Sequence, residues 1–114
     1  MIKIDGVDPK MIANNLIPFE PTHPGEVLKD EIEFRGISQK KLAKEMGVSY
    51  TVLNEILNAK RPLNTEYAML IGAALDVDAE PLLKMQTYYN LQMAKNDNKF
   101  MEKLSKIRKI AAIL

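Results

Sequence analysis

The sequence predicts an all-α protein of five or six helices, with or without one short strand near its N-terminus. Capping residues and glycines bracket successive segments, and hydrophobic residues recur at helical spacing within those segments. No internal repeat or low-complexity tract interrupts the pattern. With 114 residues, 46% hydrophobic and 27% charged, the chain has the length and composition of one globular domain with its own core.

The N-terminal part is predicted to hold two short elements and a linker. Residues 1–7 alternate apolar and polar side chains, which predicts a strand. Asp8-Pro9 has the form of a cap and first-turn proline, which predicts a short helix to about Leu16. Two prolines within 17–22 predict a linker that ends this extension.

The remaining elements are predicted to be helices set off by caps. Pro24 and Gly36 bracket a helix at about 24–35. Its inward face is predicted to carry Val27, Leu28, Ile32 and, at its end, Phe34. The later helices follow from the same signals: Ser38 before 39–46, Ser49 before 50–58, Asn64 or Thr65 before a helix to about Leu75, Asp78 before 79–95, and a last helix at 98–112.

Several classes of function find no support in the residues. Cysteine is absent and His23 is the one histidine, which disfavours a metal site and Ser-His or Cys-His catalysis. His23 itself is expected to start a helix. No paired-carboxylate motif or glycine-rich phosphate loop is found, so we expect no enzyme, no catalytic or metal-binding residue and no cofactor. Without an apolar run long enough for a membrane helix or a signal segment, a cytoplasmic protein with no membrane partner is expected.

The segment 38–58 has the pattern of a helix-turn-helix. Gly47 can take the positive φ that a sharp turn requires, and Ala43 is small enough for two closely crossing helices. The shared core of the pair is predicted to be Leu42, Met46, Val48, Leu53 and Ile56. The alternative is a helical hairpin that only packs and binds nothing.

This pattern predicts that the second helix lies in the major groove of DNA. The residues expected on its outward side are Tyr50, Thr51, Asn54 and Glu55. Of these, Thr51, Asn54 and Glu55 are expected to read base edges, and Tyr50 to contact a phosphate or a sugar. Phosphate contacts are expected from the two helix starts and the following loop, at Ser38, Gln39, Lys40, Ser49, Lys60 and Arg61. For the charged residues the alternative is a solvated surface, and for Asn54 it is a local structural hydrogen bond.

The charge distribution argues against strong binding by a single copy. Residues 31–62 carry six basic and four acidic side chains, a net charge of +2. Because affinity for DNA depends on phosphate neutralisation, we expect a homodimer on a palindromic operator. A protein-interaction module that has lost DNA binding remains an alternative.

The residues also resemble a known family. GISQKKLAKEMGVSYTVLNEILN resembles the Cro/C1-type (XRE) helix-turn-helix of lambda-repressor-like proteins. PTHPGEVLKDEIEFRGISQ is similar to the start of HigA-type antitoxins, and NEILNAKRPLNTEYAMLIGAAL and LLKMQTYYNLQMAK resemble later parts of that family. The resemblance covers about residues 21–95. Leu82 stands where the family often has Trp, and Ala59 where it often has Gly.

The resemblance implies an antitoxin that binds a HigB-type, mRNA-cleaving toxin of the RelE class and represses its own operon. It implies DNA contacts at Gln39, Ser49, Tyr50, Thr51, Asn54 and Lys60. A stand-alone repressor without a toxin is the alternative, which a neighbouring toxin gene would distinguish.

The chain is therefore divided into an extension at 1–20, a helix-turn-helix domain at 21–95 and a basic helix at 96–114. The extension is expected either to pack on the domain or to become ordered on a partner. In the last helix, apolar residues recur at steps of four and three, at Phe100, Leu104, Ile107, Ala111 and Leu114. Three uses are open for it: packing on its own core, contact with a second copy or toxin, and contact with DNA backbone or a membrane surface. Met85, Tyr88, Tyr89 and Gln92 form a patch predicted to belong to the core and dimer interface, or to contact a toxin.

Overall fold

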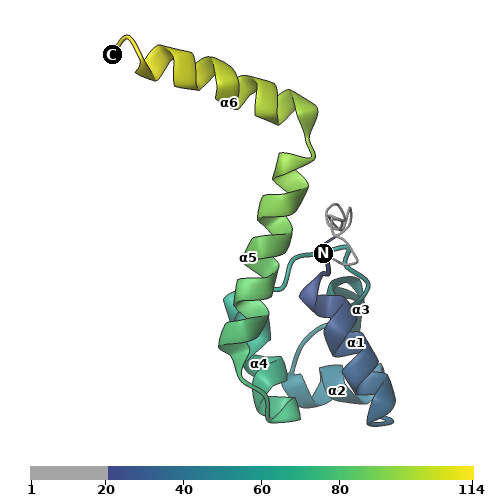
Figure 1. The fold of residues 1–114 in the computed structure, drawn as a ribbon. Coiled ribbons are helices and arrows are strands. Elements are labelled where there is room, and N and C mark those ends of the chain that lie inside the picture. Colours follow the sequence, from purple (N-terminus) through teal and green to yellow (C-terminus); the bar gives the residue numbers. More distant parts are fainter. Residues whose placement is uncertain (1–20) are drawn as a thin grey trace, which may run out of the picture.

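The computed structural model describes residues 21–114. The strand predicted at 1–7 and the helix predicted from Asp8 to about Leu16 lie outside these residues. Residues 21–114 form helices and no strand, and Figure 1 shows their arrangement. The helices are α1 (Pro24–Phe34), α2 (Gln39–Met46), α3 (Tyr50–Leu57), α4 (Thr65–Leu75), α5 (Ala79–Lys95) and α6 (Asn98–Ala111).

The predicted caps are confirmed at the starts of α2, α3, α4 and α5. The side chains of Ser38, Ser49, Asn64 and Asp78 each accept a hydrogen bond from a backbone N–H in the first turn of the helix that follows. Gly36 and Gly47 adopt φ of 70° and 71°, the left-handed conformation in which glycine ends a helix without steric cost. The helix boundaries are therefore set by local side-chain chemistry.

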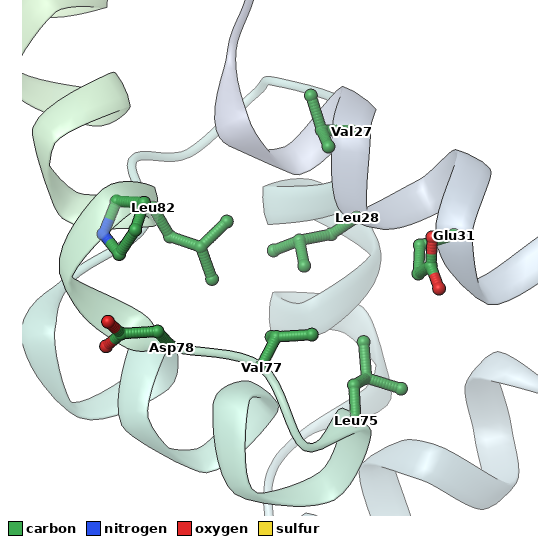
Figure 2. Close-up of a pocket in the computed structure, with 8 residues that line it drawn as sticks. Val27, Leu28, Glu31, Leu75, Val77, Asp78 and Leu82 are labelled. Atoms are coloured by element: carbon green, nitrogen blue, oxygen red, sulfur yellow. The ribbon is translucent and has the colours of Figure 1, made fainter.

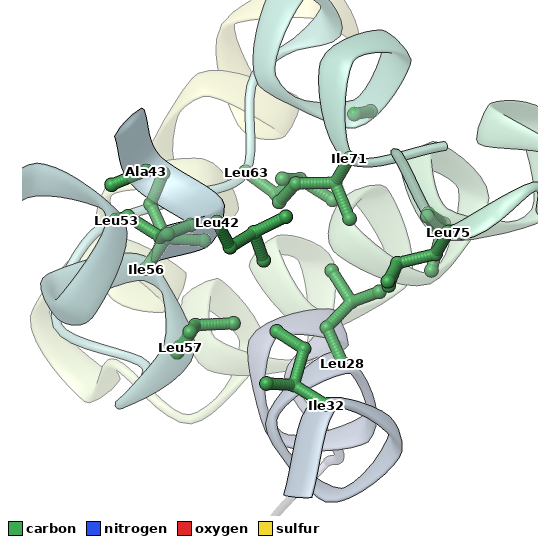
Figure 3. Close-up of a cluster of buried hydrophobic side chains, with 12 residues drawn as sticks. Leu28, Ile32, Leu42, Ala43, Leu53, Ile56, Leu57, Leu63, Ile71 and Leu75 are labelled. Atoms are coloured by element: carbon green, nitrogen blue, oxygen red, sulfur yellow. The ribbon is translucent and has the colours of Figure 1, made fainter. Parts of the chain in front are cut away.

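The core lies where α1 to α5 meet (Figure 3). Its buried side chains come from each of the first four helices and the α3–α4 loop, and α5 covers them with Leu82. The largest are Ile32, Leu53, Ile56, Leu57, Leu63, Ile71 and Leu75. Most of α5 rises beyond this core, and α6 turns away from its far end (Figure 1).

Two parts of the predicted core are wrong. Val27 is 41% exposed and Phe34 is 89% exposed, whereas Leu28 and Ile32 are buried as expected. Helical spacing predicts which side of α1 faces the core but not how much of that side is covered. Only the stripe through Leu28 and Ile32 reaches α3 and α5. Of the three uses left open for the last helix, packing on its own core finds no support, because none of the residues of α6 is buried.

The start of α1 is fastened to the rest of the domain by His23. Its Nδ1 accepts a hydrogen bond of 2.8 Å from the backbone N–H of Gly25, so His23 caps the helix as expected. Its ring meets the ring of Tyr89 on α5 edge to face, with centroids 4.9 Å apart. Burial lowers the pKa of His23 below its usual 6.5, against weaker opposing effects of the Glu26 carboxylate and a hydrogen bond with the Arg61 backbone.

Candidate nucleic-acid interface

The turn between α2 and α3 is built around Gly47. Its N–H bonds to the carbonyl oxygens of the last turn of α2, and the N–H of Val48 donates to the carbonyl of Ala43 over 3.0 Å. Leu42 and Ala43 are buried against α3, while Met46 and Val48 are half-buried beside them. The shared core of the two helices is thus the one that the sequence predicts.

Helix α3 is held in place by α1 as well as α2. Gly25 lies against the carbonyl group of Ile56, so closely that a Cβ at position 25 would overlap the carbonyl oxygen. On the same side, Lys29 Nζ donates to Asn58 Oδ1 over 2.9 Å, and Asn58 Nδ2 donates to the carbonyl of Asn54 over 2.8 Å. Sequence reasoning did not identify Lys29 or Asn58, which lie far apart in the chain and form no local pattern.

The N-terminal ends of α2 and α3 present their polar residues to solvent. Tyr50 is 42% exposed and Thr51 is exposed, as expected for residues that face away from the core. Lys40 Nζ lies 5.7 Å from the centroid of the Tyr50 ring, within cation–π range. This contact brings a positive charge from α2 to the start of α3, while Ser38 and Ser49 leave exposed helix N-termini on either side.

Gln39 and Asn54 form a hydrogen-bonded pair across the two helices. Asn54 Nδ2 donates to Gln39 Oε1 over 2.9 Å, and both residues are half-buried. The local hydrogen bond that sequence analysis gave as the alternative for Asn54 is therefore present. It uses the amide nitrogen of Asn54 and the amide oxygen of Gln39, and it leaves Gln39 Nε2 with hydrogens to donate and Asn54 Oδ1 with lone pairs to accept. The pair thus keeps the donor and acceptor that an adenine edge requires.

Glu55 and Arg61 form an ion pair with each other. Arg61 donates to Glu55 Oε1 from Nε over 3.0 Å and from Nη2 over 2.8 Å. The pair neutralises two charges that the sequence assigned separately to a base and to a phosphate. Between them in the chain, Ala59 adopts φ of 62°, and Lys60 is exposed. Lys60 therefore extends from a loop whose backbone is left-handed at the residue before it.

Other kinds of site find little in the described residues. Within 21–114, no three His, Asp or Glu side chains gather in a way that could hold a metal ion. In the same part of the chain, every helix falls short of the length and apolarity needed to cross a membrane.

Comparison with known proteins places this geometry in a family. The helix-turn-helix family matches residues 28–82. Virulence-associated protein I of Dichelobacter nodosus is 38% identical over 76 residues, which are 66% of this chain and 70% of that protein. An addiction module antidote protein of the HigA family from Coxiella burnetii is similar in structure, with a TM-score of 0.64 and 31% identity over 74% of this chain and 94% of that one. The Pseudomonas aeruginosa antitoxin HigA with the higBA promoter gives a TM-score of 0.65 and 30% identity, over the same shares of the two chains.

Proposed function

Since the chain belongs to the helix-turn-helix family that includes the HigA antitoxins, we propose that it is an antitoxin that represses its own operon. The observation that carries the DNA-binding part is the face made by the starts of α2 and α3. There two capped helix N-termini, the Gln39–Asn54 pair and the exposed Thr51 lie together. We propose that α3 enters the major groove with this face toward the bases.

The contacts within the face divide into two kinds. Base readout is expected from Thr51, which offers a methyl group and a hydroxyl, and from the Gln39–Asn54 pair. Tyr50, Lys40 and Lys60 are expected to contact the sugar-phosphate backbone, with the N–H groups that follow Ser38 and Ser49. Glu55 and Arg61 are expected to stay paired and to contribute shape rather than sequence selection.

We further propose that two copies bind one palindromic operator. The DNA-facing segment carries a small net charge, so one copy neutralises few phosphates. The outer face of α5 supports pairing of copies, because Tyr88 and Leu91 are 58% and 52% exposed there and line a shallow hollow with Leu83. Of the predicted patch on α5, Tyr88 lies on this outer face, whereas Met85 and Tyr89 are half-buried.

The toxin is proposed to be a HigB-type protein of the RelE class, neutralised by occlusion in the cytoplasm. The HigA antitoxins among the similar structures support this partner class. An antitoxin of this kind requires no active site of its own. Purification of the chain together with the product of the adjacent gene tests this part. A toxin that still arrests growth when the two are co-expressed would contradict it.

The DNA-binding part is tested by a salt-titrated binding assay on the DNA upstream of its gene, against scrambled competitor. The expected result is specific binding that Thr51→Ala weakens by about 1–3 kcal/mol. Thr22→Ala, a change at an exposed threonine before α1, should leave it unchanged. Absence of specific binding, both alone and with the neighbouring gene product, would show that the helix-turn-helix serves protein contacts instead.

A further inference from the structure

Helix α6 has an apolar stripe that no other part of residues 21–114 covers. Phe100, Ile107 and Ile110 are each between 42% and 51% exposed, and none of the residues of α6 is buried. The helix lies outside the segment that matches the family and points away from the core (Figure 1). Exposed apolar side chains gathered along one helix mark a surface that binds something.

The charge of α6 indicates what kind of surface it fits. Residues 99–114 carry five basic side chains and one acidic side chain, a net charge of +4. Lys103 lies one turn before Ile107 on the same side of the helix, and Arg108 lies on the other side of the stripe. Two such helices packed on each other would bring like charges together, whereas an apolar surface with carboxylates at its rim would complement both features.

The chain carries such a surface at the opposite end of α5. A groove of about 330 Å³ lies between α1 and the α4–α5 turn, lined by Val27, Leu28, Leu75, Val77, Pro81 and Leu82. Figure 2 shows these side chains converging from the two sides, with Glu31 and Asp78 beside them. Glu31 pairs with Arg35 and Asp78 caps α5, but each carboxylate has a second oxygen that can accept from a lysine.

In the structure, α6 of the same chain does not reach this groove, because it turns away from the far end of α5 (Figure 1). Helix α5 has 17 residues, about 25 Å at 1.5 Å per residue, and separates the groove at its start from α6 at its end. We propose that α6 of one copy docks, through its apolar stripe, into the groove between α1 and α5 of a second copy. This inference rests on the homodimer of the proposed function and specifies how that dimer is closed.

An antiparallel arrangement of the two α5 helices makes the exchange reciprocal. The outer face of α5 has Glu80 at one end and Lys95 at the other. Glu80 pairs with Lys84 over 3.4 Å on this face, and antiparallel pairing sets its second carboxylate oxygen near Lys95 of the other copy, which can donate to it. Antiparallel pairing also brings the end of each α5, and hence the start of α6, next to the groove at the start of its partner. The result is a closed two-fold dimer.

The absence of cysteine makes the contact directly testable by disulfide trapping in the full-length chain. Val27→Cys protein is mixed with Ile110→Cys protein and oxidised without DNA. We expect a linked dimer that contains one copy of each variant. Ser105→Cys, on the face of α6 opposite the stripe, is the matched control and should link poorly to Val27→Cys.

Three results would overturn the proposal. The first is equal linking of both α6 positions to the groove. The second is predominant Ile110–Ile110 linking, which would mean that α6 pairs with α6. The third is a monomeric mass for the full chain by light scattering. In that case the occupant of the groove would be residues 1–20 or a partner protein. Ile107→Glu should weaken self-association at least about tenfold, since it places a charge on the docked face. Operator binding is measured separately on the reduced proteins, so a failure of DNA binding is not confused with a failure of this contact.

Discussion

Gly25→Ala is expected to destabilise the domain sharply, because it forces α1 away from α3. The added Cβ would overlap the carbonyl oxygen of Ile56 and lie 2.8 Å from its carbonyl carbon and 3.0 Å from His23 Nδ1. The first neighbour is helix backbone and cannot rotate aside, so the start of α1 has to shift. Overpacking costs about 1–3 kcal/mol and damage to the His23 cap about 1 kcal/mol more. We therefore expect a loss of about 2–4 kcal/mol in the free energy of unfolding.

Gly36→Ala is the matched control for that change. Gly36 has φ of 70°, and a Cβ added there would have no atom within 4 Å. The substitution therefore tests left-handed backbone strain without a steric clash. The expected cost is about 1 kcal/mol. In thermal unfolding followed by circular dichroism, about 1 kcal/mol corresponds to roughly 4–8 °C in a domain of this size. A melting temperature for Gly25→Ala equal to or above that of Gly36→Ala would refute the reasoning that α1 and α3 are locked by this close approach.

Three further results are expected. In a double-mutant cycle on operator binding, Gln39→Ala and Asn54→Ala should each cost about 1–3 kcal/mol and the double variant little more than either alone; additive losses would mean that the two amides act independently. Lys60→Ala should weaken binding evenly across DNA sequences and reduce the salt slope by about 1, and a sequence-dependent loss would instead indicate base readout. Because folding lowers the pKa of His23, its contribution to stability should be complete above about pH 6.5 and be lost as the pH falls below that value. In thermal unfolding between pH 7 and 5, His23→Asn should lose less stability than the unchanged protein, because asparagine caps the helix but does not titrate.

The helices and their ends could be predicted because their causes are local. Ser38, Ser49 and Asp78 cap the helices that directly follow them, so three or four residues contain the whole signal. The division into an extension at 1–20, a domain at 21–95 and a basic helix at 96–114 stays a prediction.

The pairings within the site could not be predicted. Gln39 and Asn54 are fifteen residues apart, and their bond depends on how α2 and α3 cross. Glu55 finds Arg61 only because the loop after α3 turns back. Amphipathic spacing likewise predicts that α6 has an apolar stripe, but not which molecule covers it.

Because its backbone is left-handed, Ala59 is a position where substitution by glycine would raise thermal stability. A Cβ in this conformation costs about 1–2 kcal/mol, of which a glycine would recover a part after its greater freedom in the unfolded chain is counted. Ala59→Gly needs no other side chain to move and leaves the loop that presents Lys60 in its present conformation. A lineage selected at higher temperature could therefore gain stability at this position while keeping its operator, and an engineered repressor could use it to tolerate changes at Thr51 that alter the sequence it reads.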